Sequence, residues 1–229
     1  MIKIELLEKA GIMPAIRGMR NAFNSWDKSD SDPIYISDEE TLNMSLFDYQ
    51  LGDADKKLAM SLNKSGSSHS KYRRMIMVWI DITAPLYWWK EFDTYRAGVE
   101  KNSCSTMHTI ANKEFTIDDF SHEHLLKVPE IDTITDFPPL VSLHYIMSVL
   151  NEYRQKYLET KDKKYWWQLI QLLPSSYNQK RTVMISYETL AAIYHDRKGH
   201  KLDEWGEFRK WIENLEYSDL ITEVEDEEV

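Results

Sequence analysis

Three polar residues that could bind a ligand follow an apolar helical stretch over a short span: Arg96, Asn102 and Ser105. A guanidinium donates in a planar fork that matches phosphate oxygens, and a loop amide and a hydroxyl can satisfy a phosphate, a sugar or a polar ring. Ordinary explanations stay open. A helix C-terminus favours an arginine through its dipole, and loop Asn and Ser bond to their own backbone. The spacing indicates a polar ligand site, with a solvated turn as the alternative.

Two other groups are weaker candidates for chemistry. His122 and His124 flank Glu123, but the sequence places no third ligand beside them, which favours a solvated loop over a metal site. Cys104 is the only cysteine and lies in a polar loop without a paired histidine nearby, which favours an incidental residue over a reactive thiol. We therefore predict no metal site.

The elements that must position these residues follow from apolar periodicity. Residues 2–7 alternate as a half-buried strand does, and Met75 to Ile82 is predicted to be a buried strand. Pro85 suits a first helical turn, where its missing amide hydrogen costs nothing, and this helix is predicted to run to about Arg96. Further helices are predicted over residues 53–62, 140–157, 187–197 and 204–215, a short helix or turn over 15–20, and loops over 24–33 and 114–139.

Composition narrows the class of protein. The formal charge of -10 opposes nonspecific binding to nucleic acid, because that binding comes largely from Lys and Arg neutralising phosphates. The sequence holds no apolar run long enough to span a bilayer, and its start lacks the basic and then apolar order of a signal peptide. With a single cysteine, we expect a reducing cytoplasm and no membrane partner. Residues 218–229 are predicted to form an acidic, disordered tail.

Several motifs of the central region resemble, in order, those of the flavin-dependent thymidylate synthase family. Ala84-Pro85 resembles the Ala-Pro-apolar opening of that family, and Glu91-Phe92 stands at Gln-aromatic. Thr94-Tyr95-Arg96 stands at the Arg-His-Arg triplet, and after a one-residue insertion Asn102 to His108 stands at Asn-Glu-x-Ser-x-Arg-Tyr. The family is therefore suggested by colinear order.

The resemblance extends from about Ile2 to Leu215. Arg17 and Arg20 stand at an Arg-x-x-Arg turn, His69 at the histidine of Gly-His-x-[Ser/Thr]-x-Phe-Glu-His, and the interval from Leu173 to Arg197 has the length of the family's Leu-Pro to arginine interval. The resemblance implies an α+β fold, a mixed sheet with flanking long helices, in one domain over residues 1–217.

The family's reaction methylates dUMP to dTMP, with methylenetetrahydrofolate as the one-carbon donor and FAD carrying hydride from NADPH. The resemblance thus implies a flavoprotein of nucleotide biosynthesis, assembled as a homotetramer with active sites between subunits. It names no catalytic residue. The implied cofactor-binding residues are His69, Thr94, Tyr95, Arg96 and Asn102, and the implied substrate-binding residues are Glu91, Ser105 and Arg197.

The substitutions within these motifs leave the activity open. Thr94, Tyr95, Met107 and Ile170 stand where the family has Arg, His, Arg and Arg, and Glu91 replaces a Gln. Losing such charge-assisted contacts weakens nucleotide binding, which favours a homologue that binds flavin or a nucleotide without methyl transfer as the alternative function. A purely structural oligomer is a third hypothesis. Ser186, Glu188 and Ala192 replace further contact residues, and the cations that could compensate are Arg73, Arg74 and Lys90.

Overall fold

The computed structural model describes the chain in three stretches, residues 2–36, 46–128 and 137–222. The described residues form two compact units, which we treat separately, and the expectation of one domain over residues 1–217 stays a prediction. The first unit comprises Met1–Glu5, Asp81–Tyr95 and Lys101–Thr182. The second unit comprises Leu6–Ile80, Arg96–Glu100 and Val183–Val229.

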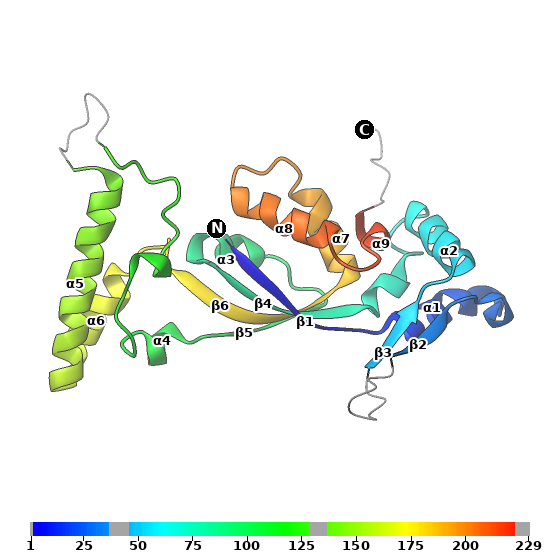
Figure 1. The fold of residues 1–229 in the computed structure, drawn as a ribbon, viewed down its shortest axis with the longest axis horizontal. Coiled ribbons are helices and arrows are strands. Elements are labelled where there is room, and N and C mark those ends of the chain that lie inside the picture. Colours follow the sequence, from blue (N-terminus) through cyan, green and yellow to red (C-terminus); the bar gives the residue numbers. More distant parts are fainter. Residues whose placement is uncertain (1, 37–45, 129–136, 223–229) are drawn as a thin grey trace. The chain divides into compact units, whose positions relative to one another are not determined.

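Helices and strands are mixed along the chain, which confirms the mixed helix and sheet content that we expect (Figure 1). Four strands pair in the order β1-β4-β6-β5, and β2 pairs with β3 in an antiparallel hairpin. The predicted strands are confirmed as β1 and β4, and burial alternates along β4 as a pleated strand requires. The strands are β1 (Lys3–Ala10), β2 (Asp32–Ile36), β3 (Leu46–Gln50), β4 (Met77–Pro85), β5 (Val99–Ser103) and β6 (Asn178–Ser186).

The helical periodicity correctly predicts α2, α5, α7 and α8, with ends that differ by a few residues. The sequence pattern does not predict α6, because the adjacent Trp166 and Trp167 obscure the apolar period. The helices are α1 (Ile12–Arg20), α2 (Asp53–Lys64), α3 (Leu86–Phe92), α4 (Thr106–Thr109), α5 (Pro139–Thr160), α6 (Lys163–Leu172), α7 (Tyr187–Asp196), α8 (Asp203–Glu213) and α9 (Asp219–Thr222).

The core of the first unit lies against α5 and α6, which run side by side (Figure 1). Leu150 of α5 and Leu169 of α6 are fully buried there, together with Phe115 and Phe120. Phe120 also forms a β-bridge with Tyr177. The described part of the predicted loop 114–139 is therefore anchored by two phenylalanines, and residues 129–136 of it lie outside the described residues.

The core of the second unit is built largely on α7 and α8. Trp205, Phe208 and Ile212 follow helical spacing along α8 and are fully buried. Tyr187, at the start of α7, is also buried, and its hydroxyl donates to the carbonyl of Glu216 at 2.7 Å. Burial raises the pKa of Tyr187, so the phenol stays a neutral donor.

A buried carboxylate organises the N-terminal part of the second unit. Asp55 of α2 pairs with Arg20 of α1 and accepts from the hydroxyls of Ser29 and Ser31 at 2.7 Å each, and from the Asp30 amide at 3.2 Å. Burial alone would raise the pKa of Asp55, but hydrogen bonds from Ser29, Ser31 and Arg20 outweigh it and lower the pKa. The Asp55 carboxylate therefore links the segment predicted as a surface loop to both α1 and α2.

The described chain continues past the expected start of the tail. In α9, Leu220 and Ile221 are 2% and 0% exposed, and the Leu220 carbonyl accepts from Asn63 Nδ2 at 3.1 Å. These two apolar residues anchor the segment Asp219–Thr222, and the boundary at residue 218 stays a prediction. The acidic residues 223–229 lie outside the described residues. Within the described part, no helix is both long and apolar enough to cross a membrane.

Candidate functional site

The end of α3 carries three of the predicted site residues, and the helix ends at Phe92, earlier than predicted. The amides of Thr94 and Tyr95 donate to the carbonyls of Glu91 and Phe92 at 3.1 Å each, and the Thr94 hydroxyl donates to the Glu91 carbonyl at 2.7 Å. The Tyr95 ring lies edge-on to Phe92, with centroids 6.4 Å apart. Thr94 and Tyr95, which stand at the Arg and His of the Arg-His-Arg triplet, thus form the end of the helix.

An ion-pair network lies beside this helix end in the first unit. Asp93 accepts from Lys101 Nζ at 2.8 Å and from Arg181 Nη1 at 2.9 and 3.1 Å. Arg181 also donates to Gln179 Oε1 at 2.9 Å and stacks 4.2 Å from the centroid of Trp89. Burial would raise the pKa of Asp93, but the hydrogen bonds from Lys101 and Arg181 lower it overall. This network fixes the direction in which the chain leaves α3.

The predicted ligand loop is the junction between β5 and α4. Asn102 is exposed, and Ser105 is partly buried. The Ser105 carbonyl accepts from the amide and hydroxyl of Thr109 at 3.0 and 2.6 Å, while its own hydroxyl does not cap α4. The Cys104 amide donates to the Lys180 carbonyl at 2.9 Å and so anchors the loop to β6. The loop backbone is therefore anchored at Cys104 and Ser105.

A polar cavity of about 450 Å³, the loop groove, borders this loop through Cys104 and Thr106. Its cations are balanced, since Lys113 pairs with Asp119 and Lys180 pairs with Asp81 at 2.5 Å. The hydrogen bond from Lys180 lowers the pKa of Asp81 and raises that of Lys180. The remaining lining residues are mostly polar or aromatic: Thr83, Thr109, Ile110, Asn112, Phe115, Asp118, Tyr177, Asn178 and Gln179.

Arg96 belongs to the second unit and is exposed beside the start of α7. The next two carbonyls are held there: Ala97 accepts from the Thr189 hydroxyl at 2.6 Å, and Gly98 accepts from the Ser186 amide at 3.0 Å. A Cβ on Gly98, whose φ is +64°, would lie 2.7 Å from Ser186 Oγ, so the close approach requires glycine. The backbone after Arg96 is thus fixed while its side chain remains accessible.

Two of the three cations proposed to compensate for lost arginines, Arg73 and Arg74, have structural partners. Arg74 Nη2 donates to Glu188 Oε1 at 2.9 Å, and Nε pairs with the other oxygen, which raises the pKa of Arg74. Arg73 is 6% exposed and donates to the Leu220 carbonyl at 3.4 Å and to Ser70 Oγ at 3.1 Å. Burial lowers the pKa of Arg73. The third cation, Lys90, is exposed and takes no part in the hydrogen bonds named above for Arg73 and Arg74.

The histidines differ in their surroundings. His69 is exposed in the turn that precedes a short 3₁₀ helix, Lys71–Arg74, and its amide donates to the Gly66 carbonyl at 3.0 Å. His122 Nδ1 lies 2.8 Å from the Phe120 carbonyl, so this ring nitrogen already has a hydrogen-bond partner within the protein. In the described residues no group of three His, Cys, Asp or Glu side chains could hold a metal ion.

Arg197, the residue directly after α7, lines a second cavity of about 370 Å³, the α7–α8 pocket. Its guanidinium carbon lies 4.4 Å from the ring centroid of buried Trp205. Arg209 stacks over Tyr194 at 4.3 Å and donates to the Tyr194 carbonyl at 2.9 Å. Four basic side chains and two carboxylates line the pocket, which suits an anionic ligand: Arg197, His200, Arg209, Lys210, Asp203 and Glu207, with Gly199 and Gly206.

The predicted residues divide between the units. Glu91, Thr94, Tyr95, Asn102 and Ser105 belong to the first unit, and His69, Arg96 and Arg197 to the second. Sequence reasoning did not find Arg181 or the basic residues His200, Arg209 and Lys210. Gln179 and Arg181 are two residues apart, a spacing that places both side chains on one face of a strand. Of the basic residues, His200 follows Arg197 by three positions, and Arg209 and Lys210 are adjacent.

The fold is similar to that of solved flavin-dependent thymidylate synthases. Two crystal structures of Helicobacter pylori ThyX with FAD and dUMP are similar to this chain, each with a TM-score of 0.65, 15% identity and coverage of 97% of this chain and 98% or 99% of theirs. The UMP/dUMP methylase PolB from Streptomyces cacaoi, bound with 5-Br UMP, matches with a TM-score of 0.53, 14% identity and coverage of 85% and 75%. At these identities the similarity defines the fold. No family model matches the chain, and no curated protein matches it.

Proposed function

We propose that this protein binds FAD and a uridine nucleotide and methylates dUMP to dTMP. The observation that carries the proposal is the fold similarity over nearly the whole of both chains, because the similar ThyX structures contain FAD and dUMP. Fold alone does not determine function, so the argument rests next on the side chains present.

Arg197 is the proposed nucleotide anchor. The stack on Trp205 orients the guanidinium, and the edge of a stacked guanidinium can donate to a phosphate or a ring carbonyl. Asn102 and Ser105 would supply neutral donors from the loop. Glu91 repels a phosphate, so it would accept from a nucleotide N–H or O–H such as the uracil N3–H. These assignments predict recognition by hydrogen bonds more than by charge.

Met107 and Ile170 stand where the family has arginines, so we expect this chain to bind a nucleotide more weakly than a site with those arginines would. Met107 is 51% exposed and offers only a thioether, and Ile170 packs against the core of the first unit. Each missing charge-assisted contact costs about 1.5–3 kcal/mol, or at least about tenfold in affinity. We expect dUMP to bind, with an affinity set mainly by Arg197.

Exposure supports three of the five positions that we propose for the flavin. His69, Arg96 and Asn102 are exposed and can donate, whereas Thr94 and Tyr95 are used at the end of α3. When bound, FAD would supply hydride transfer from NADPH for the one-carbon unit of methylenetetrahydrofolate. The residues of this chain would hold and orient the ring. We further propose a homotetramer in the cytoplasm, in keeping with the single cysteine.

Calorimetric titration of dUMP tests the nucleotide assignment. We expect binding by the native protein and at least about tenfold weaker binding by Arg197→Ala. Arg17→Ala is the matched control, because Arg17 also lies over a tryptophan, Trp26 at 5.3 Å, but on α1. Equal affinity in the native protein and Arg197→Ala would refute the anchor. Absence of both dUMP and FAD binding would favour the purely structural oligomer.

A second function, binding of flavin or nucleotide without methyl transfer, is favoured by the structural use of Thr94 and Tyr95. The rate at which NADPH bleaches bound flavin separates the two. A synthase predicts a rate that dUMP changes, and a binding protein predicts indifference to dUMP. In both cases Arg96→Ala should purify with much less flavin, and unchanged flavin content would remove Arg96 from the site.

A further inference from the structure

The chain that follows α8 lies across the second unit as a strap, a name that we give to residues 215–222. Leu215, Leu220 and Ile221 are 7%, 2% and 0% exposed, so burial of apolar surface holds the strap in place. Its helix α9 contacts α2, α7 and α8 (Figure 1). The strap is therefore a packed part of the second unit, and its polar contacts reach elements that are far away in the sequence.

Hydrogen bonds tie the strap to both ends of α2. Just before the helix, the Leu51 amide donates to the Tyr217 hydroxyl at 3.1 Å. In the last turn, Asn63 Nδ2 donates to the Leu220 carbonyl at 3.1 Å. Tyr217 has a φ of +55°, a left-handed conformation that costs free energy in a residue with a Cβ. A strained residue of this kind persists only where its surroundings fix it, so the strap is held in one path along α2.

The Leu220 carbonyl joins the strap to the 3₁₀ helix Lys71–Arg74. It accepts from Asn63 Nδ2 and also from Arg73 Nη1, the latter at 3.4 Å. Asn63 Oδ1 in turn accepts from the Tyr72 hydroxyl at 2.8 Å. All four residues are buried, and burial raises the pKa of Tyr72 to about 12, so its phenol stays a neutral donor. Two routes of buried hydrogen bonds thus connect the strap with this short helix.

One route continues to the turn that carries His69. Arg73 Nη2 donates at 3.1 Å to the hydroxyl of Ser70, which is 0% exposed. The Ser70 carbonyl accepts from the Arg73 amide at 3.0 Å. The amides of His69 and Ser70 donate to the Gly66 carbonyl at 3.0 and 3.2 Å. His69 itself is exposed. The strap therefore fixes the buried residue that lies directly after an exposed histidine.

Arg73 costs stability at this position. The residue is 6% exposed, and in the described structure its buried Nε has no hydrogen-bond partner. Burial disfavours the charged form and lowers the pKa of Arg73. Replacement of a buried charge by an apolar group of similar volume is often stabilising, so packing alone does not explain an arginine here. What the guanidinium supplies is a pair of donors that reach the strap and the turn at once.

We propose that the strap positions His69 for the flavin, and that Ser70, Tyr72 and Arg73 are the positioning residues that connect the two. The inference rests on the proposed function, in which His69 contacts the flavin. A ligand that binds an exposed side chain on a loose turn must order that turn, and the entropy lost weakens the affinity. A turn that the strap already holds avoids this loss. The affinity for FAD should therefore depend on residues that do not touch it.

Hydrogen exchange in the protein without flavin tests whether the strap holds the turn. Ser70→Ala removes the acceptor of Arg73, Tyr72→Phe removes the donor to Asn63, and neither alters the histidine. Because each variant leaves a buried polar partner unsatisfied, we expect the amides of residues 66–74 to exchange at least about tenfold faster. Exchange at the native rate in both variants would overturn the proposal.

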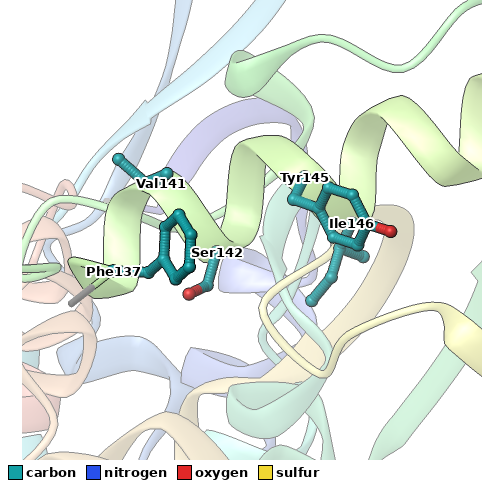
Figure 2. A pocket seen from close by; sticks show the side chains of 5 residues that line it. All are labelled: Phe137, Val141, Ser142, Tyr145 and Ile146. Carbon is teal, nitrogen blue, oxygen red and sulfur yellow. The ribbon is translucent and has the colours of Figure 1, made fainter. Parts of the chain in front are cut away.

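Ser65→Ala is the matched control, because the Ser65 hydroxyl donates to the Ser61 carbonyl at 2.9 Å on the exposed side of the same turn. This variant should exchange as the native protein does. Residues 137–146 of the first unit, where Phe137 and Tyr145 border an apolar groove (Figure 2), are an internal reference and should exchange at one rate in every variant. Equally faster exchange in Ser65→Ala or in this reference would indicate a general loss of stability and contradict the proposal.

Titration of FAD over a double-mutant cycle tests the connection with His69, at a temperature where every variant is folded. We expect Ser70→Ala to weaken FAD binding about tenfold in the native background and to change it little in His69→Ala, because Ser70 acts through His69. Equal losses in the two backgrounds would refute the positioning role even if exchange is faster. Absence of FAD binding by the native protein would instead refute the proposed function, and with it the role in flavin binding, while the exchange rates would still decide whether the strap holds the turn.

Discussion

Arg181 of the first unit and Arg197 of the second both lie over a tryptophan ring, at 4.2 Å from Trp89 and 4.4 Å from Trp205. Their surroundings differ. Arg181 donates to both oxygens of Asp93 and is 15% exposed, whereas Arg197 lines a cavity of about 370 Å³ together with three other basic side chains and two carboxylates. Both arginines stack on a tryptophan, but Arg181 stabilises a helix end in the first unit and Arg197 borders a pocket in the second.

The comparison teaches that residue type and stacking do not identify a ligand site. A carboxylate partner fixes an arginine as part of the scaffold, and a cavity makes an arginine accessible to an anion. By this criterion Arg20 and Arg74, paired with Asp55 and Glu188, belong to the scaffold. Arg197 and Arg209, which both stack on aromatic rings, line the α7–α8 pocket and stay the proposed contacts of an anion.

Asp55→Asn tests how much a buried carboxylate–arginine pair contributes to stability, and it has the largest expected effect. Removing the charge leaves Arg20, which is 4% exposed, without its carboxylate, so we expect a loss of about 3–5 kcal/mol in the free energy of unfolding. Urea denaturation measures it. Asp53→Asn, an exposed carboxylate in the same helical turn, is the control and should lose less than about 1 kcal/mol. Equal losses would show that the buried pair contributes little.

The pH dependence of stability provides a second measure of the Asp55 contribution. Because the folded-state pKa of Asp55 is lowered, its contribution is complete above the ordinary carboxyl value of 3.8 and disappears as the pH falls from there through the folded pKa. Asparagine does not titrate. The difference in unfolding free energy between the native protein and Asp55→Asn should therefore shrink on acidification, and a difference that grows would reverse the assigned direction.

Arg181→Ala tests whether the first stacked arginine is structural. We expect a loss of about 1.5–3 kcal/mol in unfolding free energy, because Asp93 loses a charge-assisted partner, and no change in dUMP affinity at a temperature where the variant is folded. A double-mutant cycle with Asp93→Asn should show coupling between the two residues. Weaker dUMP binding with unchanged stability would place Arg181 with Arg197 instead.

Arg197→Ala should give the opposite pattern. Its stacking contact is worth less than about 1 kcal/mol at a partly exposed site, and we expect thermal stability to change less than in Arg181→Ala while dUMP affinity falls at least about tenfold. Thermal unfolding with and without dUMP measures both on one sample, because a bound ligand raises the midpoint. A large loss of stability without a change in affinity would make Arg197 a scaffold residue like Arg181.

Met107→Arg adds a cation where the family has one and should produce the smallest effect. Met107 is 51% exposed, so we expect unchanged stability and about tenfold tighter dUMP binding. Leu172→Arg, at a residue 45% exposed in the same unit, controls for the added charge. An equal gain in both variants would indicate nonspecific attraction of the phosphate.

The sequence predicts most of the long helices because their apolar period is local. It does not predict β6, whose first four residues, Asn178 to Arg181, are all polar and mask the strand pattern. Arg197 stays a predicted ligand contact, and the sequence does not predict that Arg74 pairs with Glu188, 114 positions away. Ion pairs over such separations depend on the fold and leave no local spacing to read.

The visible absorbance spectrum of the purified native protein, with the released ligand identified by mass spectrometry, tests the proposed function most directly. The account predicts stoichiometric FAD and a bleaching rate with NADPH that responds to dUMP. A colourless protein that cannot be reconstituted with FAD would contradict the flavin assignment and leave this fold with a different ligand or none.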